Sequence, residues 1–280
     1  YQQSGAYGFR DQLQDSQLWL LYEPERCRDQ ILLHAAHQFV DGSVYHWWNP
    51  ITETGLHDAC SDDYLWLPFV TAAYIRETGD VAILDERVRF VDDEETATLA
   101  EHCLRSIRRS LSRRTERGLP LIGDNDWNDG LSHVGDATRG ESVWVAFFLG
   151  DVLGEFADAI RAHGQSDVAD GLLASRDEVL GAVNEHGWDG EWFRRATDKQ
   201  GRWLGSKESA EGKLFLNPQS WAILTEATTE ERAAAAWDAV RETLIQDYGV
   251  LLLAPAYTVP DPEIGYLSRY APGARENGGV

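Results

Sequence analysis

The chain has 280 residues, a formal net charge of −22 at neutral pH and an aromatic content of 11%, which includes 11 tryptophans. This length can bury a large core, and the aromatic content argues against intrinsic disorder. The negative charge repels phosphate backbones, so nucleic acid is not expected as a partner. The sequence contains no apolar run of about 18 residues, so no membrane span is expected either.

The three cysteines, Cys27, Cys60 and Cys103, lie far apart and lack the CxxC spacing of a zinc knuckle. A reducing, cytoplasmic setting fits them best. His34 and His37 stand three residues apart, as two metal ligands on a helix do, but no third ligand is apparent beside them. We therefore expect core or surface histidines here, and no metal site.

Helical periodicity dominates the chain. It predicts helices over residues 62–77, 94–115, 140–163 and 166–184. Pro68 lies inside the first of these segments and would have to be accommodated as a kink. The third segment is apolar almost all round from Val143 to Leu153, which predicts burial on most sides.

Loops rich in Gly, Asp and Trp separate the predicted helices, at residues 41–61, 118–140 and 186–217. Alternating short and long connections, without convincing parallel strands, predict an all-α toroid of helical hairpins whose site lies where the long loops gather. Residues 192–205 form the exception and predict a small β-hairpin with its turn at Lys199 to Gly201. No repeat or linker divides the chain, so we expect one domain over residues 1–280.

Two segments carry candidate sugar contacts. Residues 4–16 place Arg10, Asp11 and Asp15 close together. An arginine with neighbouring carboxylates can bind sugar hydroxyls as both donor and acceptor, although the same spacing also fits an ion pair at a helix start.

The second segment is the loop around His46, Trp47 and Trp48. Pyranose faces stack on indole rings, and adjacent large aromatic residues in a loop are less easily explained by core packing than a helical stripe is. Most of the other tryptophans are expected in the core, where aromatic side chains contribute much of the buried area.

The most informative stretch is the acidic segment GLPLIGDNDWNDGLSHVG. In it, Asp124, Asp126 and Asn128 occupy alternate positions, like the first ligands of a calcium loop. An EF-hand would then require Gly in place of Asp129 and Glu in place of Gly135. The calcium pattern fails at both positions.

What remains is a compact acidic turn anchored by Trp127. Burial and like charge can raise the pKa of one carboxyl in such a turn, and a carboxylic acid of that kind can protonate a glycosidic oxygen. These residues leave open an inverting β-glycosidase, which would need a second carboxylate to activate water, and a non-catalytic sugar-binding module.

Eight ordered blocks resemble the inverting glycoside phosphorylases of glycoside hydrolase family 94. The blocks are YQQSGAYGFRDQLQDS, HWWNP, SDDYLWLP, GLPLIGDNDWNDGLSHVG, RGESVW, WDGEWFRRA, LNPQSWAIL and PGARENGGV. The family includes cellobiose, chitobiose, laminaribiose and 1,2-β-oligoglucan phosphorylases and the phosphorolytic part of cyclic β-1,2-glucan synthases. The resemblance implies an (α/α)6-barrel catalytic domain that converts a β-glucoside and inorganic phosphate, without a cofactor, into an α-sugar 1-phosphate.

The resemblance also implies roles for single residues. Asp129 would be the catalytic acid, with phosphate as the attacking group, and Trp127 would shape the donor site. Arg10 and Asp15 would contact the donor sugar, with Asp11 as a rival to Asp15. Further residues lie in blocks that line the cleft and receive no specific role: Asp62, Asp63, Gln219 and Glu276.

In the family the phosphate-binding His and Thr-Gly elements follow the ENGG block, and this chain stops at Val280 directly after it. We therefore expect an internal piece of a longer protein, inactive alone, with an open or incomplete barrel. The resemblance leaves open a homodimer of the full-length protein, and it leaves open the linkage and the acceptor sugar. FRDQLQD and HWWNP are closer to the members that act on β-1,2-glucans.

Overall fold

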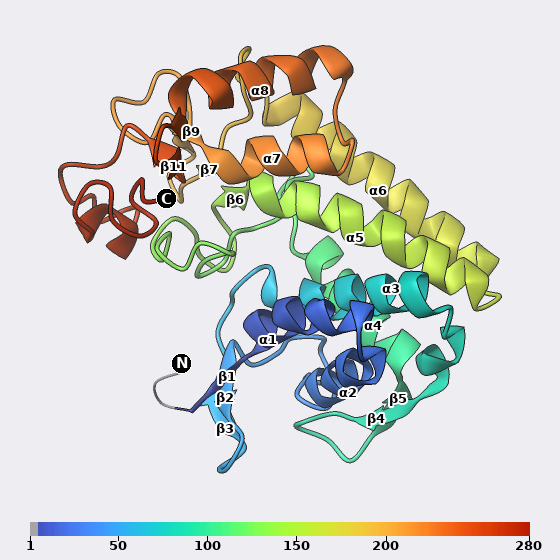
Figure 1. Ribbon diagram of the computed structural model, residues 1–280. Helices are drawn as coiled ribbons and strands as arrows, with labels where there is room; N and C mark the ends of the chain where they lie inside the picture. The colour runs from blue at the N-terminus through green and yellow to red at the C-terminus, as the bar shows by residue number, and fades with distance from the viewer. Residues whose placement is uncertain (1–4) are drawn as a thin grey trace. The chain divides into compact units, whose positions relative to one another are not determined.

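The computed structural model describes residues 5–280, which form eight α-helices joined by short antiparallel strands and loops (Figure 1). This confirms the prediction of a mainly helical fold. Contacts divide the chain into two compact units. Unit 1 comprises Tyr1–Asp58, Asp62–Ser112 and Asp151–Arg176, and unit 2 comprises Ala59–Ser61, Arg113–Gly150 and Asp177–Val280.

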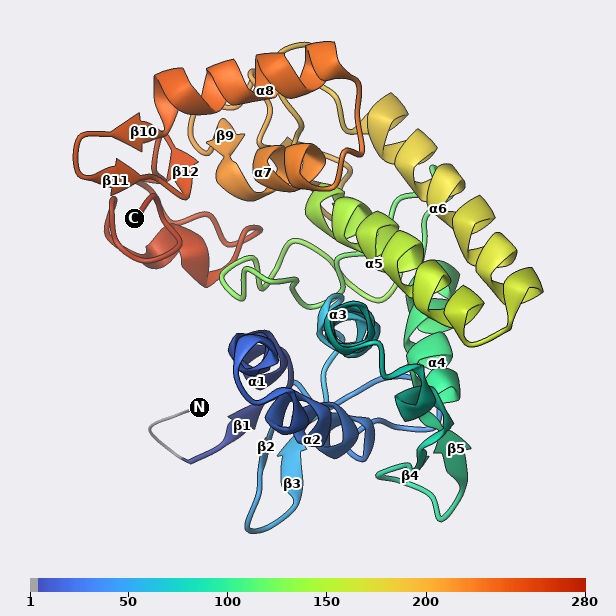
Figure 2. The ribbon, with the colours of Figure 1, turned by 45° about the vertical axis from the view of Figure 1, so that its right-hand side comes forward.

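Unit 1 contains four complete helices. They are α1 (Phe9–Ser16), α2 (Pro24–Ala35), α3 (Trp66–Thr78) and α4 (Leu99–Ser112). Its strands are β1 (Tyr7–Gly8), β2 (Trp47–Asn49), β3 (Thr54–Leu56), β4 (Arg87–Arg89) and β5 (Thr96–Thr98). Its 3-10 turns are η2 (Gln17–Leu21), η3 (Asp63–Leu65) and η4 (Val81–Asp85). Helices α1, α2 and α3 pack against one another, as Figure 2 shows, and bury Phe9, Leu13, Ile31 and Val70 completely.

Pro68 does not kink a helix. The sequence predicted one helix from residue 62, but a 3-10 turn precedes α3, which begins at Trp66. Pro68 is therefore the third helical residue, where a backbone N–H would have no partner within the helix. The proline costs no hydrogen bond at this position.

Two long helices, α5 (Val143–Ala162) and α6 (Ser166–His186), form an antiparallel hairpin with a short connection. Each helix begins in one unit and ends in the other, so the division of the chain falls inside helices and not at a linker. The expectation of one domain stays a prediction. Facing residues show the register of the hairpin: Gly187 with Val143, Gly150 with Leu180, and Arg161 with Asp170.

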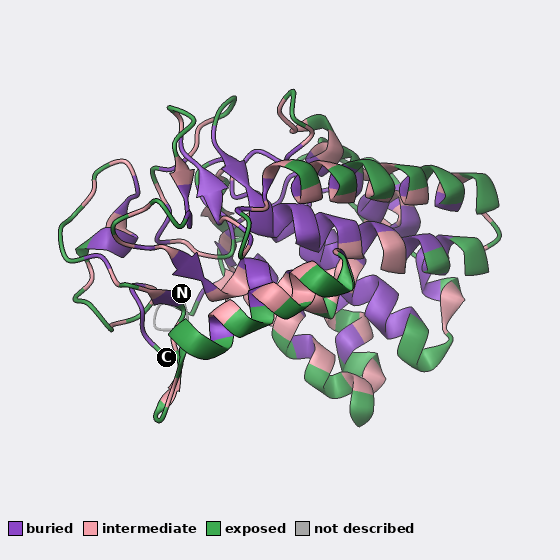
Figure 3. Ribbon diagram, turned by 90° about the horizontal axis from the view of Figure 1, so that it is seen from above, coloured by how far each residue is buried: buried purple, intermediate pink, exposed green. Residues whose placement is uncertain are grey.

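Helix α5 is buried on every side at its start. All seven residues from Val143 to Leu149 have no exposed surface, and buried residues are purple in Figure 3. This confirms the prediction from the unbroken apolar run. The predicted helix over 140–163 differs from the observed one by only a few residues at each end.

The other elements of unit 2 are shorter. The helices are α7 (Leu216–Leu224) and α8 (Glu230–Thr243), which pack against each other, and the 3-10 turn is η5 (Tyr266–Arg269). The strands are β6 (Glu141–Ser142), β7 (Ala196–Thr197), β8 (Trp203–Leu204), β9 (Leu214–Phe215), β10 (Ile245–Gln246), β11 (Gly249–Val250) and β12 (Leu253–Ala254). Strands β7 and β8 form the hairpin predicted over 192–205, and the turn contains Gly201 at a φ of +81°.

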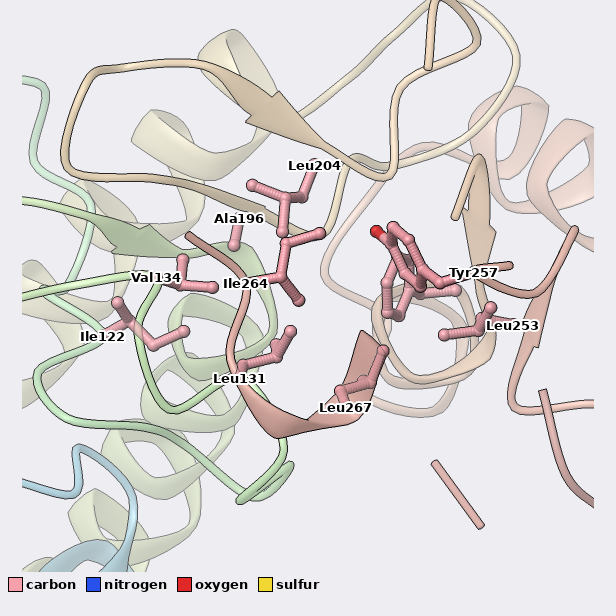
Figure 4. Close-up of a cluster of buried hydrophobic side chains, with 10 residues drawn as sticks. Ile122, Leu131, Val134, Ala196, Leu204, Leu253, Tyr257, Ile264 and Leu267 are labelled. Carbon is pink, nitrogen blue, oxygen red and sulfur yellow. The ribbon is translucent and has the colours of Figure 1, made fainter. Parts of the chain in front are cut away.

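A buried apolar cluster supports the acidic loop of unit 2. It joins Leu131 and Val134 of that loop to Leu204 of β8 and to the C-terminal residues Ile264 and Leu267 (Figure 4). Apolar contacts of this kind hold a long loop in one conformation that its own backbone would not specify. Within residues 5–280, no helix has the length and apolar content needed to cross a bilayer.

Candidate active site

The three acids of the acidic turn have different environments in unit 2. Asp124 is an exposed residue whose carboxylate accepts a hydrogen bond from the Ala59 backbone N–H at 2.9 Å. Asp126 is fully buried, and Asp129 is partly exposed. Among these three carboxylates, Asp129 therefore combines partial burial with access to a substrate.

Asp126 belongs to a buried polar network. Arg195 donates from Nη1 to Oδ2 of Asp126 at 2.7 Å and from Nη2 to Oδ1 at 2.5 Å, and Ser142 Oγ donates to Oδ2 at 2.7 Å. Burial alone would raise the pKa of Asp126, but the charge and hydrogen bonds of Arg195 outweigh it and hold the pKa below its usual value. Asp126 is thus an ionised anchor and not a proton donor.

Two Asx turns enclose Asp129. Oδ1 of Asp126 accepts from the Asn128 backbone N–H at 3.0 Å, and Oδ1 of Asn128 accepts from the Gly130 N–H at 3.0 Å. A Cβ at Gly130 would lie 2.7 Å from Cβ of Leu267, so only glycine fits there. The backbone on both sides of Asp129 is therefore held in place.

Trp127, two residues before Asp129 in the same turn, offers an aromatic surface. Its ring stacks on Trp144 at 5.2 Å and meets the edge of Trp221 at 6.4 Å, yet 39% of the residue stays exposed. Apolar ring faces of this kind accommodate the C–H face of a pyranose. The structure thus places a partly exposed carboxylic acid and a partly exposed indole two residues apart.

Asp129 and Glu276 both act on Tyr270. Burial raises the pKa of Tyr270, and the charges of Glu276 and Asp129 raise it further. Both carboxylates are partly buried. Among the described residues, Oε2 of Glu276 makes no hydrogen bond, and its charge partner is Nε of Arg275 at 3.6 Å. A buried carboxylate oxygen without a donor is a suitable acceptor for a sugar hydroxyl.

Arg10 lies in a charge-balanced cluster of unit 1. Its Nη1 is 3.0 Å from Oδ1 of Asp62 and 3.7 Å from Oδ1 of Asp63. Asp63 also binds His46 through Nδ1 at 2.7 Å, and Asp62 accepts from Nε1 of Trp66 at 2.9 Å. The two acids are buried behind Arg10, so they orient this guanidinium.

His46 is cationic at neutral pH. Burial would lower the pKa of this imidazole, but the charge of Asp63 and the hydrogen bond to it outweigh burial and raise the pKa to about 9. Two cations and two anions therefore meet in this cluster, which explains how four ionisable groups can be buried together.

Asp15 does not join Arg10. Its carboxylate stands on another side of α1 and lines a cavity of about 480 Å³, together with Gln12 and Trp19 among others. Asp11 lies in the first turn of α1, with its carboxylate folded toward Gly8. In the described part of unit 1, Arg10 thus pairs with Asp62 and Asp63, whereas Asp15 lines a cavity beside Gln12 and Trp19.

A family model described as the glycosyl hydrolase 94 superfamily, catalytic domain, matches residues 1–280. The chain belongs to the glycosyl hydrolase 94 superfamily. This confirms the family resemblance of the eight sequence blocks.

The relatives in this superfamily are longer than the chain. It is 37% identical to the cyclic beta-(1,2)-glucan synthase NdvB of Rhizobium meliloti (strain 1021), over 100% of this chain and 10% of that protein. It is 36% identical to the solabiose phosphorylase of Paenibacillus borealis, over 97% of this chain and 35% of that protein. The chain thus spans about a tenth to a third of the length of these relatives.

A solved structure shares the fold. The GH78 family rhamnosidase of Bacillus sp. GL1 matches with a TM-score of 0.64 at 13% identity, over 84% of this chain and 22% of the rhamnosidase. At this identity the likeness concerns the fold alone.

Four expected substrate contacts of this glycosyl hydrolase 94 chain are buried: Asp62 and Asp63 in the cluster around Arg10, and Trp48 and Gln219 in the core. Trp48 has no exposed surface and stacks on His37 at 4.1 Å, with His34 at its edge. Gln219 is also fully buried, and its amide exchanges hydrogen bonds with the Phe193 backbone N–H and C=O. None of these four side chains is accessible to a sugar in the structure as it stands. Trp47, on the opposite face of β2, is partly exposed.

Sequence reasoning missed Arg195, Ser142 and Tyr270. Only tertiary contacts bring these residues to the acidic turn. Arg195 is 69 residues from Asp126 and Ser142 is 16 residues from it. Arg195 and Ser142 do lie in two of the quoted blocks, WDGEWFRRA and RGESVW. Within WDGEWFRRA, nothing in the sequence distinguishes Arg195 from its neighbour Arg194.

Proposed function

We propose that this glycosyl hydrolase 94 chain carries the acid of an inverting phosphorolysis, in which a β-glucoside and inorganic phosphate give an α-sugar 1-phosphate and a shortened acceptor. The observation that supports it best is the environment of Asp129. Of the three acids of the turn, Asp124 is exposed, Asp126 is fully buried and paired with Arg195, and Asp129 is partly exposed, two residues after Trp127.

The chemistry needs one carboxylic acid. Asp129 donates its proton to the glycosidic oxygen as the bond from that oxygen to the anomeric carbon breaks. A phosphate oxygen attacks the same carbon from the opposite face, which inverts β to α. Phosphate is already anionic, so no second carboxylate is required to activate it, unlike the water of an inverting glycosidase.

Other residues fit supporting roles in this proposal. Trp127 is a stacking surface, and Glu276 is an acceptor for a sugar hydroxyl. Arg10, oriented by Asp62 and Asp63, stays a candidate donor on the basis of its family block. The fold likeness and the helical hairpin support an (α/α)6 arrangement of the helices as part of the same proposal. Asp11, Asp15 and Trp47 stay candidates for substrate contact on the basis of their family blocks.

The decisive variant is Asp129→Asn in the full-length protein that carries this chain. We expect it to abolish phosphorolysis, because the amide N–H is not acidic enough to transfer a proton to the leaving oxygen, while substrate affinity changes little. Release of sugar 1-phosphate, measured with phosphate present, checks this, and Asp124→Asn serves as the matched control in the same turn. Retained turnover in Asp129→Asn would overturn the assignment.

Phosphate dependence separates the alternatives. Sugar release that continues without phosphate would indicate an inverting glycosidase. Sugar binding without turnover, unchanged in Asp129→Asn, would indicate a binding module. The linkage is proposed to be β-1,2, supported by the similarity to a protein named cyclic beta-(1,2)-glucan synthase, although the solabiose phosphorylase is almost equally similar. Synthesis from glucose 1-phosphate and a panel of acceptors, followed by linkage determination, tests this.

A further inference from the structure

A fully buried ion pair lies behind the acidic turn, and stability alone does not account for it. Neither Asp126 nor Arg195 has exposed surface. Removing two charges from water costs several kcal/mol for each ion, so such a pair is often no more stabilising than apolar residues of similar volume. Its distinctive property is geometry, because a bidentate arginine fixes both the position and the orientation of a carboxylate.

The carboxylate of Asp126 transmits that geometry to Asp129. The oxygen that accepts from Nη2 of Arg195 is Oδ1, and the same oxygen accepts from the Asn128 backbone N–H. The side chain of Asn128 then accepts from the N–H of Gly130. A rotation of the Asp126 carboxylate would therefore break the first of the two turns that enclose Asp129.

Arg195 is itself fixed from behind. Its backbone N–H donates to the carbonyl of Leu204 at 2.9 Å, and its carbonyl accepts from the N–H of Val143, the first residue of α5, at 3.1 Å. Gln219 holds Phe193, two residues before Arg195, through both its backbone N–H and its carbonyl. The guanidinium is thus anchored to a hairpin strand and to the start of a buried helix.

We propose that Arg195 is a positioning residue for the acid, acting through Asp126 on the turn that carries Asp129. The inference rests on the proposed function of Asp129. Lysine cannot substitute, because its single ammonium cannot bind both oxygens of a carboxylate in a fixed plane. Ser142 supports the same carboxylate from Oδ2.

The test compares Arg195→Lys with Arg194→Lys in the full-length protein. Arg194 is a matched control, since its Nη2 also pairs with a carboxylate, that of Asp189, in the same unit. We expect Arg195→Lys to lower kcat by about 10- to 100-fold, the loss typical of a catalytic group displaced by about 1 Å. The KM values for sugar and phosphate should change little, and the control should keep its kcat.

A merely structural role predicts a different result. In that case kcat falls only in proportion to the loss of folded protein, as measured by thermal unfolding and active-site titration. This outcome, or an unchanged kcat in Arg195→Lys, overturns the proposal. If Arg195→Lys does not fold, Ser142→Ala decides: a lower kcat at unchanged KM supports the proposal, and an unchanged kcat refutes it.

The pH profile adds a readout that folding defects do not mimic. Loosening the turn changes the surroundings of Asp129, so the basic limb of kcat against pH should move in Arg195→Lys and stay in Arg194→Lys. A failure of the positioning role of Arg195 is distinguishable from a failure of the proposed function. Turnover in Asp129→Asn would contradict the catalytic role, whereas an inactive Asp129→Asn with an unaffected Arg195→Lys contradicts only the positioning role.

Discussion

Among single residues, His46 makes the stability of the charge cluster in unit 1 depend on pH. Its pKa is raised to about 9, mainly because the charge and hydrogen bond of Asp63 exceed the opposing effect of burial. Arg10 lowers this pKa and Asp58 raises it slightly. A group with a higher pKa when folded stabilises the fold fully below its unfolded pKa, near 6.5, and this stability disappears as the pH rises through 9.

We therefore expect the melting temperature to fall between pH 6.5 and 9, and His46→Asn to remove most of that slope. Asparagine keeps an N–H donor near the position of Nδ1 but cannot carry the charge. The variant should be less stable than the parent at pH 6 and close to it at pH 10. Thermal unfolding across this range measures the effect, and an equal slope in both proteins would contradict it.

The glycines of helices α5 and α6 allow the effect of packing on stability to be distinguished from the effect of helix propensity. A Cβ at Gly150 would lie 2.5 Å from Cδ2 of Leu180, whereas a Cβ at Gly171 or Gly181 would meet nothing within 4 Å. Glycine inside a helix costs roughly 0.5–1 kcal/mol relative to alanine. We expect Gly171→Ala and Gly181→Ala each to raise the free energy of unfolding by about this amount.

Gly150→Ala is the matched contrast in the same hairpin. The added methyl must displace Leu180, so the gain in propensity is cancelled or reversed. Urea unfolding of the three variants measures the free energy of unfolding and so tests both the gain in helix propensity and the loss of packing. A stabilisation of Gly150→Ala equal to that of Gly181→Ala would show that the helices do not pack in this register.

Strand β2 shows why the sequence predicted helices better than loops. Apolar periodicity over many residues identified α5 and α6, but a three-residue strand carries no such pattern. Trp47 and Trp48 were expected as neighbours in a loop, and both as sugar contacts. In a strand, adjacent side chains point to opposite faces, so Trp48 enters the core while Trp47 stays partly exposed.

At the scale of the whole molecule, long-range contacts mark the limit of sequence reasoning. Asp129 was singled out because the calcium pattern failed and the family block assigned its position. The environment that distinguishes it from Asp126 depends on Arg195, 69 residues away from Asp126. No local pattern predicts such a pairing, and the same holds for Arg10 and Asp62, which are 52 residues apart.

The net charge of −22 is a property of the whole chain and opposes its compact state. Acidic residues number 47 against 25 basic ones, so self-repulsion exceeds the attraction within the exposed ion pairs, each of which contributes little.

Salt screens both the repulsion and the ion pairs, with a Debye length of about 30 Å at 0.01 M and about 8 Å at 0.15 M. Because the long-range repulsion is screened most, we expect added NaCl to raise the melting temperature over this range. KCl should act equally, since screening depends on ionic strength, whereas an equimolar uncharged solute should not. A melting temperature that falls with NaCl would show that the ion pairs, such as Arg108 with Glu101, contribute more than the net repulsion.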